Sequence, residues 1–333
     1  MGITGNAGFG RGAPLEPSAT DPAPSPPTCL PEVSVIVAVY NGQDTIRDCL
    51  ESLLALDYPR GQWELIVVDN ASRDETPRIL ERYGRRLTIL HEHVRGPAAA
   101  RNRGLRHATG HTVAFTDADC VVDPRWLRHL VAPLQDRAVG IVGGRILARR
   151  PCNMIAQFGE RIHDHRRAIQ DVIPPYAITM NWASPRAALQ EIGLFDPRLL
   201  RCSDVDLAFR LVGAGYRLVY EPDAIIYHRN RSTVRALMWE GYRHGYHAVP
   251  VLQRHRQFRS TYGARARTGI PWPSRGALRG IARPLQSMVQ LAATPRELPW
   301  ALCFGLAKNA GRLLGTLATA AVSRDGADRG TNG

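Results

Sequence analysis

The sequence predicts an α/β protein built on a Rossmann-like, mostly parallel sheet with helices on both faces. Val33–Val39 and residues 64–68 are nearly continuous runs of β-branched and aliphatic residues, which is typical of strands buried on both faces. Segments with a helical period of apolar residues follow these runs, and the alternation of strands and helices favours a parallel sheet. Polar residues come directly after three of the strands, at the sheet edge where open α/β folds bind ligands.

The expected elements follow in chain order. A helix at 46–54 places its apolar residues on one face. Ser72 and Glu75 have the spacing of a capping box for the helix after the second strand, while Pro97 can begin the next helix and Gly110 can end it. Residues 154–168 are interpreted as a polar helix or loop. The other expected strands are 87–90, 111–116, 138–147, 178–183 and 224–228, and the other expected helices are 97–106, 124–134, 185–192 and 203–213.

The strand-like run that begins at Val113 ends in two carboxylates, Asp117 and Asp119. Hard carboxylate oxygens suit Mg²⁺ or Mn²⁺, and such ions typically bridge diphosphates. The alternative reading is a polar turn before Pro124. Polar residues at 40–41 and 69–70 also follow strands, so the three strand ends together describe a nucleotide crevice.

Composition is that of an ordinary globular protein with an excess of basic residues. Of its 333 residues, 44% are hydrophobic and 22% are charged, and the formal net charge is +13. Nearly all of the basic residues are arginine, and Lys308 is the only lysine. Arginine suits bidentate contacts with phosphate, although so uniform a preference can also reflect genome composition. No G-x-G-x-x-G or P-loop motif is present, which disfavours dinucleotide and P-loop folds.

The six cysteines show no C-x-x-C spacing, so we expect reduced thiols in a cytoplasmic protein rather than a zinc site or a disulfide framework. Residues 1–30 are rich in Gly, Pro and Ala and lack the apolar core of a signal peptide. We expect them to form a disordered tail.

Six motifs occur in a fixed order between Val33 and His228. They are VSVIVAVYN from Val33, LIVVDNAS from Leu65, GPAAARNRG from Gly96, FTDAD from Phe115, IGLFD from Ile192 and SDVDLAFRL from Ser203. In this order they resemble the family 2 glycosyltransferases, which have a GT-A fold. The resemblance implies an inverting transfer of a sugar from a UDP-, GDP- or dTDP-sugar to a glycan or lipid-linked acceptor, as in cell-envelope glycan, exopolysaccharide or glycolipid synthesis.

The resemblance also implies roles for individual residues. Tyr40 would lie against the donor base, Asp69 would accept a hydrogen bond from it, and Arg101 would approach the phosphates. The alternatives are a helix cap for Asp69 and a solvated helix face for Arg101. The implied nucleotide-sugar-binding residues are Val39, Tyr40, Asn41, Asp69, Asn70, Arg101 and Asp117.

Asp119 would hold Mn²⁺ or Mg²⁺ most directly, with Asp117 contacting the ribose or a metal-bound water. His228 follows a strand-like run and is the third implied ligand; a satisfied surface histidine is the alternative. A bound cation would act as a Lewis acid toward the leaving diphosphate.

Asp204, in the Ser203–Asp206 segment, would be the general base that removes the proton of the acceptor hydroxyl. Ser203 and Asp206 also have the spacing of a capping box, which leaves Asp204 free. Asn181, Trp182 and Ser203 are the implied acceptor-binding residues; for Trp182 a core position is the alternative.

Three positions depart from the family's usual residues. Ala38 stands where proline is usual, Asn70 where a second aspartate is common, and Ser203 where glutamate is common. Asn70 retains hydrogen-bonding capacity but carries no charge, so its contact with the donor is expected to differ. Ser203 in place of glutamate affects the expected orientation of the base.

The resemblance ends near His228, and we divide the chain accordingly. Residues 31–228 are expected to form the GT-A domain, with a nucleotide-binding half at 31–120 and an acceptor-binding half at 121–228. Residues 229–323 are expected to form a basic helical extension, and residues 324–333 a disordered tail.

The extension suggests peripheral contact with the inner face of a membrane. Residues 229–267 are rich in Arg, His and Tyr, a composition that suits anionic lipid or a lipid diphosphate; a solvated basic helix pair is the alternative. Residues 299–322 are long enough to span a bilayer, but Lys308 and Arg312 interrupt them, so an interfacial amphipathic helix is favoured. No motif for nucleic-acid binding accompanies the basic residues.

Two other functions compete with glycosyl transfer. A nucleotidyltransferase also combines an α/β sheet with aspartate and Mg²⁺, but it would need a second carboxylate for a metal pair and usually a glycine-rich phosphate loop. A non-catalytic nucleotide- or membrane-binding scaffold could keep the fold, but it would not need both Asp119 and Asp204.

Overall fold

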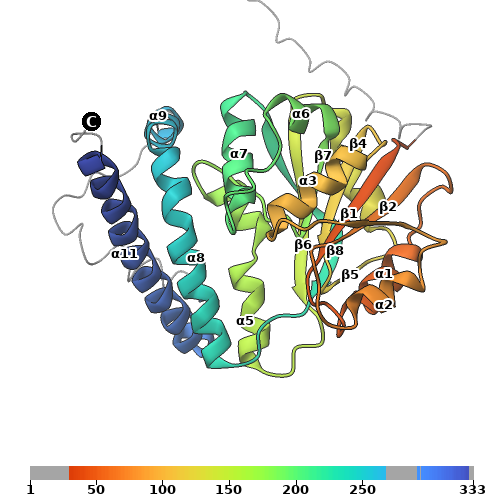
Figure 1. The fold of residues 1–333 in the computed structure, drawn as a ribbon, viewed down its shortest axis with the longest axis horizontal. Helices are drawn as coiled ribbons and strands as arrows, with labels where there is room; N and C mark the ends of the chain where they lie inside the picture. Colours follow the sequence, from red (N-terminus) through yellow and green to blue (C-terminus); the bar gives the residue numbers. More distant parts are fainter. Residues whose placement is uncertain (1–29, 268–290, 293, 330–333) are drawn as a thin grey trace, which may run out of the picture. The chain divides into compact units, whose positions relative to one another are not determined.

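The computed structural model describes residues 30–267, 291–292 and 294–329. The expected tail at residues 1–29 lies outside these ranges. An eight-stranded mixed sheet forms the centre of the fold, with the strand order β3-β2-β1-β4-β7-β6-β8-β5 (Figure 1). The strands are β1 Val33–Val39, β2 Trp63–Asp69, β3 Thr88–His91, β4 Thr112–Asp117, β5 Cys120–Val122, β6 Val139–Ala148, β7 Asn181–Pro185 and β8 Arg217–His228.

The first four strands are parallel, as the sequence predicts. β1 pairs with β2 on one side and with β4 on the other, and β2 pairs with β3. The register places Val39 beside Asp69 and Ala38 beside Asp117. The polar residues that follow these strands therefore meet at one edge of the sheet.

The second half of the sheet is mixed. β7 lies antiparallel between β4 and β6, β8 runs parallel to β6, and β5 closes the order antiparallel to β8. β8 begins at Arg217, well before the strand expected at 224–228. Its first half carries charged side chains and a register shift opposite Gly144–Arg145, and this interrupts the apolar pattern by which strands are recognised.

Helices cover both faces of the sheet, as the sequence predicts. Gly104 of α3 packs directly against Ile36 and Val68, so α3 covers that face, and the alternate residues of the same strands face α1 and α4. The helices are α1 Ile46–Leu54, α2 Thr76–Glu81, α3 Pro97–His107, α4 Trp126–Val131, α5 Met154–Ile162, α6 Arg186–Glu191, α7 Ser203–Gly213, α8 Val234–Arg254, α9 Arg256–Arg267 and α11 Leu298–Arg329, with 3-10 turns at Ala132–Gln135 and Pro295–Glu297 and a π-helical turn at Arg167–Asp171.

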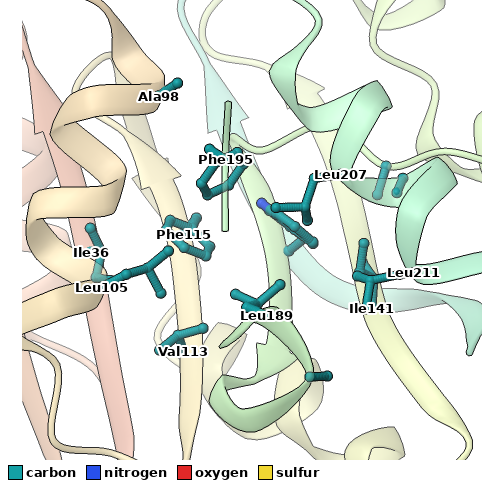
Figure 2. Close-up of a cluster of buried hydrophobic side chains, with 14 of the residues drawn as sticks. Ile36, Ala98, Leu105, Val113, Phe115, Ile141, Leu189, Phe195, Leu207 and Leu211 are labelled. Atoms are coloured by element: carbon teal, nitrogen blue, oxygen red, sulfur yellow. The ribbon is translucent and has the colours of Figure 1, made fainter. Parts of the chain in front are cut away.

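A cluster of buried side chains holds α3, α6 and α7 against the sheet (Figure 2). Phe115 at its centre stacks on Trp182 and meets the edge of Phe195. Burial of each such aromatic side chain contributes roughly 1.5–3 kcal/mol relative to an exposed one. The cluster fixes α7, which carries Asp204, relative to β4, which carries Asp117.

The capping box expected at Ser72 and Glu75 is wrong. α2 begins at Thr76, and the side chain of Glu75 caps nothing at its start. The N–H of Thr76 donates instead to Oδ1 of Asp74 at 3.0 Å. The Thr76 hydroxyl accepts from the N–H of Gly42 at 2.8 Å, which ties the helix to the loop after β1.

The C-terminal helices α8 and α11 lie side by side and run in the same direction (Figure 1). Gly245 and Gly311 allow this packing, because a Cβ atom on Gly245 would lie 1.9 Å from the Lys308 carbonyl oxygen and one on Gly311 would lie 2.1 Å from that of Tyr242. Residues of α5, α8 and α11 share a second apolar cluster. α11 continues to Arg329, past residue 324, where we expected the ordered chain to end. Among the described residues, no helix is both long enough and apolar enough to cross a bilayer.

Candidate active site

A cleft of about 1330 Å³ runs from the carboxyl ends of β1 and β4 to the C-terminal helices. Tyr40, Asn41, Arg101, Asp117, Asp119, Ser203, Asp204 and His228 all line it. The structure thus brings most of the predicted site residues together, although they come from five separate segments of the chain.

Arg101 and Asp117 form a partly buried ion pair in the cleft. Nη2 of Arg101 donates to Oδ1 of Asp117 at 2.8 Å, and the arginine side chain is buried. The solvated helix face considered for Arg101 is therefore wrong. Arg101 lies on α3, and its guanidinium extends to Asp117 at the end of β4.

Asp119 and His228 form a second pair beside the first. Nε2 of His228 lies 3.4 Å from Oδ2 of Asp119. Burial by itself would lower the pKa of His228, but the hydrogen bond to Asp119 and the charge of that carboxylate raise this pKa to about 9. The same pairing holds the pKa of Asp119 below its usual value, although burial opposes this shift.

Asn230 fixes the orientation of the His228 ring. Its Nδ2 donates to the Ala156 carbonyl at 2.9 Å, so its Oδ1 faces Nδ1 of His228, 2.6 Å away. Nδ1 must then carry the proton, which leaves Nε2 as the nitrogen directed at Asp119. A histidine held by an outer partner in this way is typical of metal ligands. The donor set of Asp119 and His228, with Asp117 beside them, fits Mn²⁺ or Mg²⁺.

Asp204 lies at the start of α7, with its carboxylate inside the cleft. Its Oδ1 accepts from the N–H of Val205 at 2.9 Å, and its Oδ2 accepts from the N–H of Thr179 at 3.4 Å. Burial raises the pKa of Asp204 above its usual value, and the charge of Arg101 opposes this shift. A carboxylate with a raised pKa and few partners is suited to accept a proton.

The backbone before α7 is held in an unusual conformation. Cys202 has a φ of 59°, in the left-handed region, which non-glycine residues seldom adopt. Asn41 and Ala71 also have positive φ values. Such residues cluster at functional sites because the surrounding structure must hold them there.

The strand-end residues of β1 and β2 divide into two groups. Tyr40 is 45% exposed on the cleft, with the guanidinium of Arg95 lying 4.4 Å from its ring centroid. Val39, Asp69 and Asn70 are buried and do not line the cleft; Val39 accepts from the Asn70 N–H at 2.8 Å.

The side chains of Asp69 and Asn70 form hydrogen bonds with nearby backbone groups. Oδ1 of Asp69 accepts from the N–H of Ser72 at 3.2 Å, the local turn contact that was the alternative to ligand binding. Asn70 donates to the carbonyls of Glu92 and Val94 and accepts from the N–H of Gly96. It thereby ties β2 to the loop that leads into α3.

Asn181 and Trp182 lie in the core and not on the cleft. Trp182 is 0% exposed and stacks on Phe115. Asn181 accepts from Nε1 of Trp126 at 2.7 Å and donates to the carbonyls of Arg145 and Ala224. The side chains of β7 point to the two faces of the sheet, where Phe115 and Phe195 cover Trp182 and Trp126 of α4 covers Asn181. The expectation that these two residues bind the acceptor is therefore wrong. Thr179 and Met180, just before the strand, line the cleft instead.

The capping box expected at Ser203 and Asp206 is also wrong. No side chain caps the start of α7. Asp206 is fully buried and accepts from Arg210 at 3.0 Å, Arg254 at 3.0 Å and His255 at 2.9 Å. No local sequence pattern predicts this cluster, because Arg254 and His255 lie at the end of α8, far from Asp206 in the chain.

A second group of potential metal ligands was not predicted from the sequence. Ligand atoms of His129, Glu221 and Asp223 lie within 4.8 Å of one another. These residues do not line the cleft. All of the described cysteines are free, in agreement with the prediction.

Comparison with known proteins identifies the family. The sequence model of glycosyl transferase family 2 matches residues 34–193. Glycosyltransferase AglE of Haloferax volcanii is 29% identical over 293 residues, which cover 85% of this chain and 96% of that protein. The mannosyltransferase PcManGT from Pyrobaculum calidifontis, solved in complex with GDP-Man and Mn²⁺, matches with a TM-score of 0.62 and 27% identity over 87% of this chain and 89% of that one.

This chain carries a family 2 glycosyltransferase match over residues 34–193 and is a glycosyltransferase. The pre-mycofactocin glycosyltransferase of Mycobacterium tuberculosis is 31% identical over 72% of this chain, which spans about half of that relative (52%). The glycosyltransferase has the GT-A fold that the motifs predict, and the structure of S. aureus TarS 1–349 in complex with UDP-GlcNAc shares this fold at a TM-score of 0.50 and 17% identity. These matches favour a glycosyltransferase over the nucleotidyltransferase and the non-catalytic scaffold.

Proposed function

We propose that this glycosyltransferase moves one sugar from a nucleotide-sugar donor to an acceptor hydroxyl in a single displacement that inverts the anomeric centre. The observation that carries the proposal is the position of Arg101. Its guanidinium binds Asp117 of the metal-binding end of the cleft, and its charge also acts on Asp204. The residues proposed for the leaving group and for the acceptor proton therefore face one shared space.

The donor diphosphate is assigned to the end of the cleft at Asp117, Asp119 and His228. These residues would hold Mn²⁺ or Mg²⁺, which when bound supplies a Lewis acid that neutralises the leaving diphosphate. Tyr40 offers an exposed ring for the donor base, and Asn41 lines the cleft beside it. The complex of the Pyrobaculum mannosyltransferase with GDP-Man and Mn²⁺ supports this assignment.

The acceptor is assigned to the other side of Asp204. The carboxylate takes the proton of the acceptor hydroxyl while that oxygen attacks the anomeric carbon. Among the described residues, the contacts to it come from backbone N–H groups such as those of Thr179 and Val205, so a lone pair remains for the hydroxyl. Burial keeps water away and raises the basicity of the group.

We also propose peripheral contact between the C-terminal helices and an anionic membrane. Leu306, Leu313 and Leu317 of α11 are 61%, 63% and 58% exposed, and they repeat at a helical spacing that places them on one face. An exposed apolar face on a chain with a net charge of +13 suits a negatively charged lipid surface. Glycan or lipid-linked acceptors are compatible with this location.

Donor binding tests the proposal directly. UDP-, GDP- and dTDP-sugars are each added with Mn²⁺ while thermal unfolding is followed, because a ligand at 100 times its Kd stabilises the native state by roughly 2.7 kcal/mol. We expect one nucleotide to raise the Tm in wild type and much less in Asp119→Asn. Slow hydrolysis of that donor should then release the nucleoside diphosphate. Release of the monophosphate, or equal stabilisation of both proteins, would contradict the proposal.

A further inference from the structure

Four cationic side chains gather in the half of the cleft that is formed by the C-terminal helices. Lys308 and Arg312 lie one turn apart on α11, Arg243 lies on α8, and Arg201 lies just before α7; all four line the cleft. Figure 1 shows these helices along one side of the domain. The group is called the cation cluster below.

The members of the cation cluster have no anionic partner within the part of the chain that the structure describes. None of the four forms a salt bridge or a side-chain hydrogen bond with a described residue. The ammonium of Lys308 lies 5.7 Å from the ring centroid of Phe304. Nε of Arg201 is buried and has no hydrogen-bond partner among the described residues.

One carboxylate of α8 lines the same cleft, but it contacts histidine rather than the cation cluster. Oε1 of Glu240 lies 3.6 Å from Nε2 of His163 and 4.0 Å from that of His244. Burial opposes the shift, but the pairing with His163 lowers the pKa of Glu240 to about 2. Its single negative charge acts on Arg201 and cannot balance four cations, which repel one another in a partly desolvated space.

Lys308 responds to this repulsion. Burial and the charge of Arg312 lower the pKa of Lys308 to about 8. It is the only lysine in a chain with 43 lysine and arginine residues. A compact ammonium with three donors, held on the inner face of a helix, is suited to a phosphate oxygen.

The cation cluster and the proposed base Asp204 line the same cleft. Arg201 lies three residues before Asp204, and Arg201, Lys308 and Arg312 all act on the buried thiol of Cys202 between them. Asp119 and His228, proposed for the donor side, pair with each other. The cluster is therefore available to a group on the acceptor.

We propose that the cation cluster is a subsite for a phosphate or diphosphate ester carried by the acceptor. It would hold the anionic group while a hydroxyl of the same molecule is presented to Asp204. This inference rests on the proposed function, since it places the anion beside the transferase acceptor. Two oxygen-rich negative charges would complete a site that otherwise holds four like charges.

α11 points to a lipid-linked source for that phosphate. Its cleft-facing side carries Lys308 and Arg312, whereas its outward side carries the exposed Leu306, Leu313 and Leu317. A surface helix normally shows the reverse arrangement, with apolar residues inward and charged residues outward. An acceptor with an apolar tail and a phosphate head matches both sides of this helix.

Selective chemistry at the single lysine tests the subsite. The full chain is treated with limiting acetic anhydride in metal-free buffer, and acetylation of Lys308 is followed by mass spectrometry. Farnesyl phosphate, farnesol and inorganic phosphate are the probes. We expect farnesyl phosphate to protect Lys308 and farnesol not to protect it. Protection by inorganic phosphate at equal concentration would support the phosphate subsite but assign it to a water-soluble acceptor.

Variants show whether protection depends on the cluster. Arg312→Gln should weaken farnesyl phosphate binding roughly tenfold or more, because it removes a charged hydrogen bond. Arg235→Gln is the matched control, since Arg235 is exposed on α8 and lies outside the cleft; it should bind as wild type does. Equal losses in both variants, protection by farnesol, or absence of any protection would overturn the subsite.

Donor hydrolysis in the same preparations separates the two proposals. If Arg312→Gln loses farnesyl phosphate binding but keeps wild-type donor hydrolysis, the subsite stands apart from the transfer chemistry. If phosphate binding is normal and no donor is hydrolysed, the proposed function fails while the anion subsite remains.

Discussion

Nε2 of His228 lies 3.4 Å from Oδ2 of Asp119, although the two residues belong to distant parts of the chain. The antiparallel pairing of β5 with β8 is responsible, because it aligns Cys120 with His228. The N–H of Arg229 also donates to the carbonyl of Asp119 at 3.1 Å. The three-residue strand β5 thus brings together Asp119 and His228, the two residues proposed to hold the metal ion.

Removal of the Asp119 charge should disable catalysis. Asp119→Asn keeps the shape of the side chain but removes a hard anionic ligand, and we expect turnover to fall by ~10²-fold or more, as for loss of a comparable electrostatic contact. Turnover is measured during a Mn²⁺ titration, with Glu81→Gln, an exposed acid outside the cleft, as the control. Normal turnover of wild type in metal-stripped buffer would refute the metal role.

Asp204→Asn should abolish the chemistry and spare the fold. A general base acts in the transition state, so kcat and kcat/KM should fall together. Because burial raises the pKa of Asp204, the ionised carboxylate is less stable in the folded than in the unfolded chain. The neutral amide should therefore keep or raise the Tm at neutral pH. An early melt with normal turnover would make Asp204 structural and would require another base.

The acid limb of the pH–rate profile should report Asp204. Its raised pKa means that the base becomes protonated at a higher pH than an ordinary aspartate, whose pKa is about 3.9. Arg101→Gln removes the charge that opposes the shift, so the limb of kcat/KM should move to still higher pH. Arg101→Lys keeps the charge and should leave the limb near its wild-type position. If neither substitution shifts the acid limb, the limb does not report Asp204.

Asp206 should matter for stability far more than a capping residue would. Asp206→Ala leaves Arg210, Arg254 and His255 without their shared buried partner, and the expected loss of unfolding free energy is on the order of 3 kcal/mol. Denaturant unfolding measures it, with Asp223→Ala as the exposed control. A loss of about 1 kcal/mol would match only a helix cap.

The same carboxylate predicts a pH dependence of stability. Burial opposes the shift, but the hydrogen bond from His255 and the charge of Arg210 hold the pKa of Asp206 below its usual value. Its contribution is therefore present above the unfolded pKa and is lost as pH falls through the folded one. Asp206→Ala should flatten this acid-side loss.

The outward face of α11 should bind anionic vesicles. Flotation with anionic vesicles at low salt should recover the protein, and added salt should release it. Leu313→Gln with Leu317→Gln should reduce recovery, because both leucines are exposed on α11. Val94→Gln, an exposed apolar residue elsewhere, should not. Equal flotation with neutral vesicles, or none at low salt, would argue against this contact.

The nucleotide half of the fold could be predicted because its signals are local. Buried parallel strands such as Val33–Val39 read as uninterrupted apolar runs, and the polar residues after them must meet at one edge. Asp117, Asp119 and Asp204 were found in this way, through strand ends and motifs. Trp182 and Asn181 were misplaced because their exposure depends on what packs on each face of β7, here Phe195 and Trp126, and adjacency in sequence does not reveal this.

What the sequence determined by itself was the family, the parallel half of the sheet and the carboxylates of the cleft, because each rests on residues close together in the chain. Only the tertiary structure decided which of these side chains face solvent and which partners they meet. Three contacts join distant segments: the pairing of Asp119 with His228, the cation cluster at Lys308, and the burial of Asp206 beside Arg210, Arg254 and His255. Long-range strand pairing and helix packing set these contacts, and no local pattern in the chain encodes them.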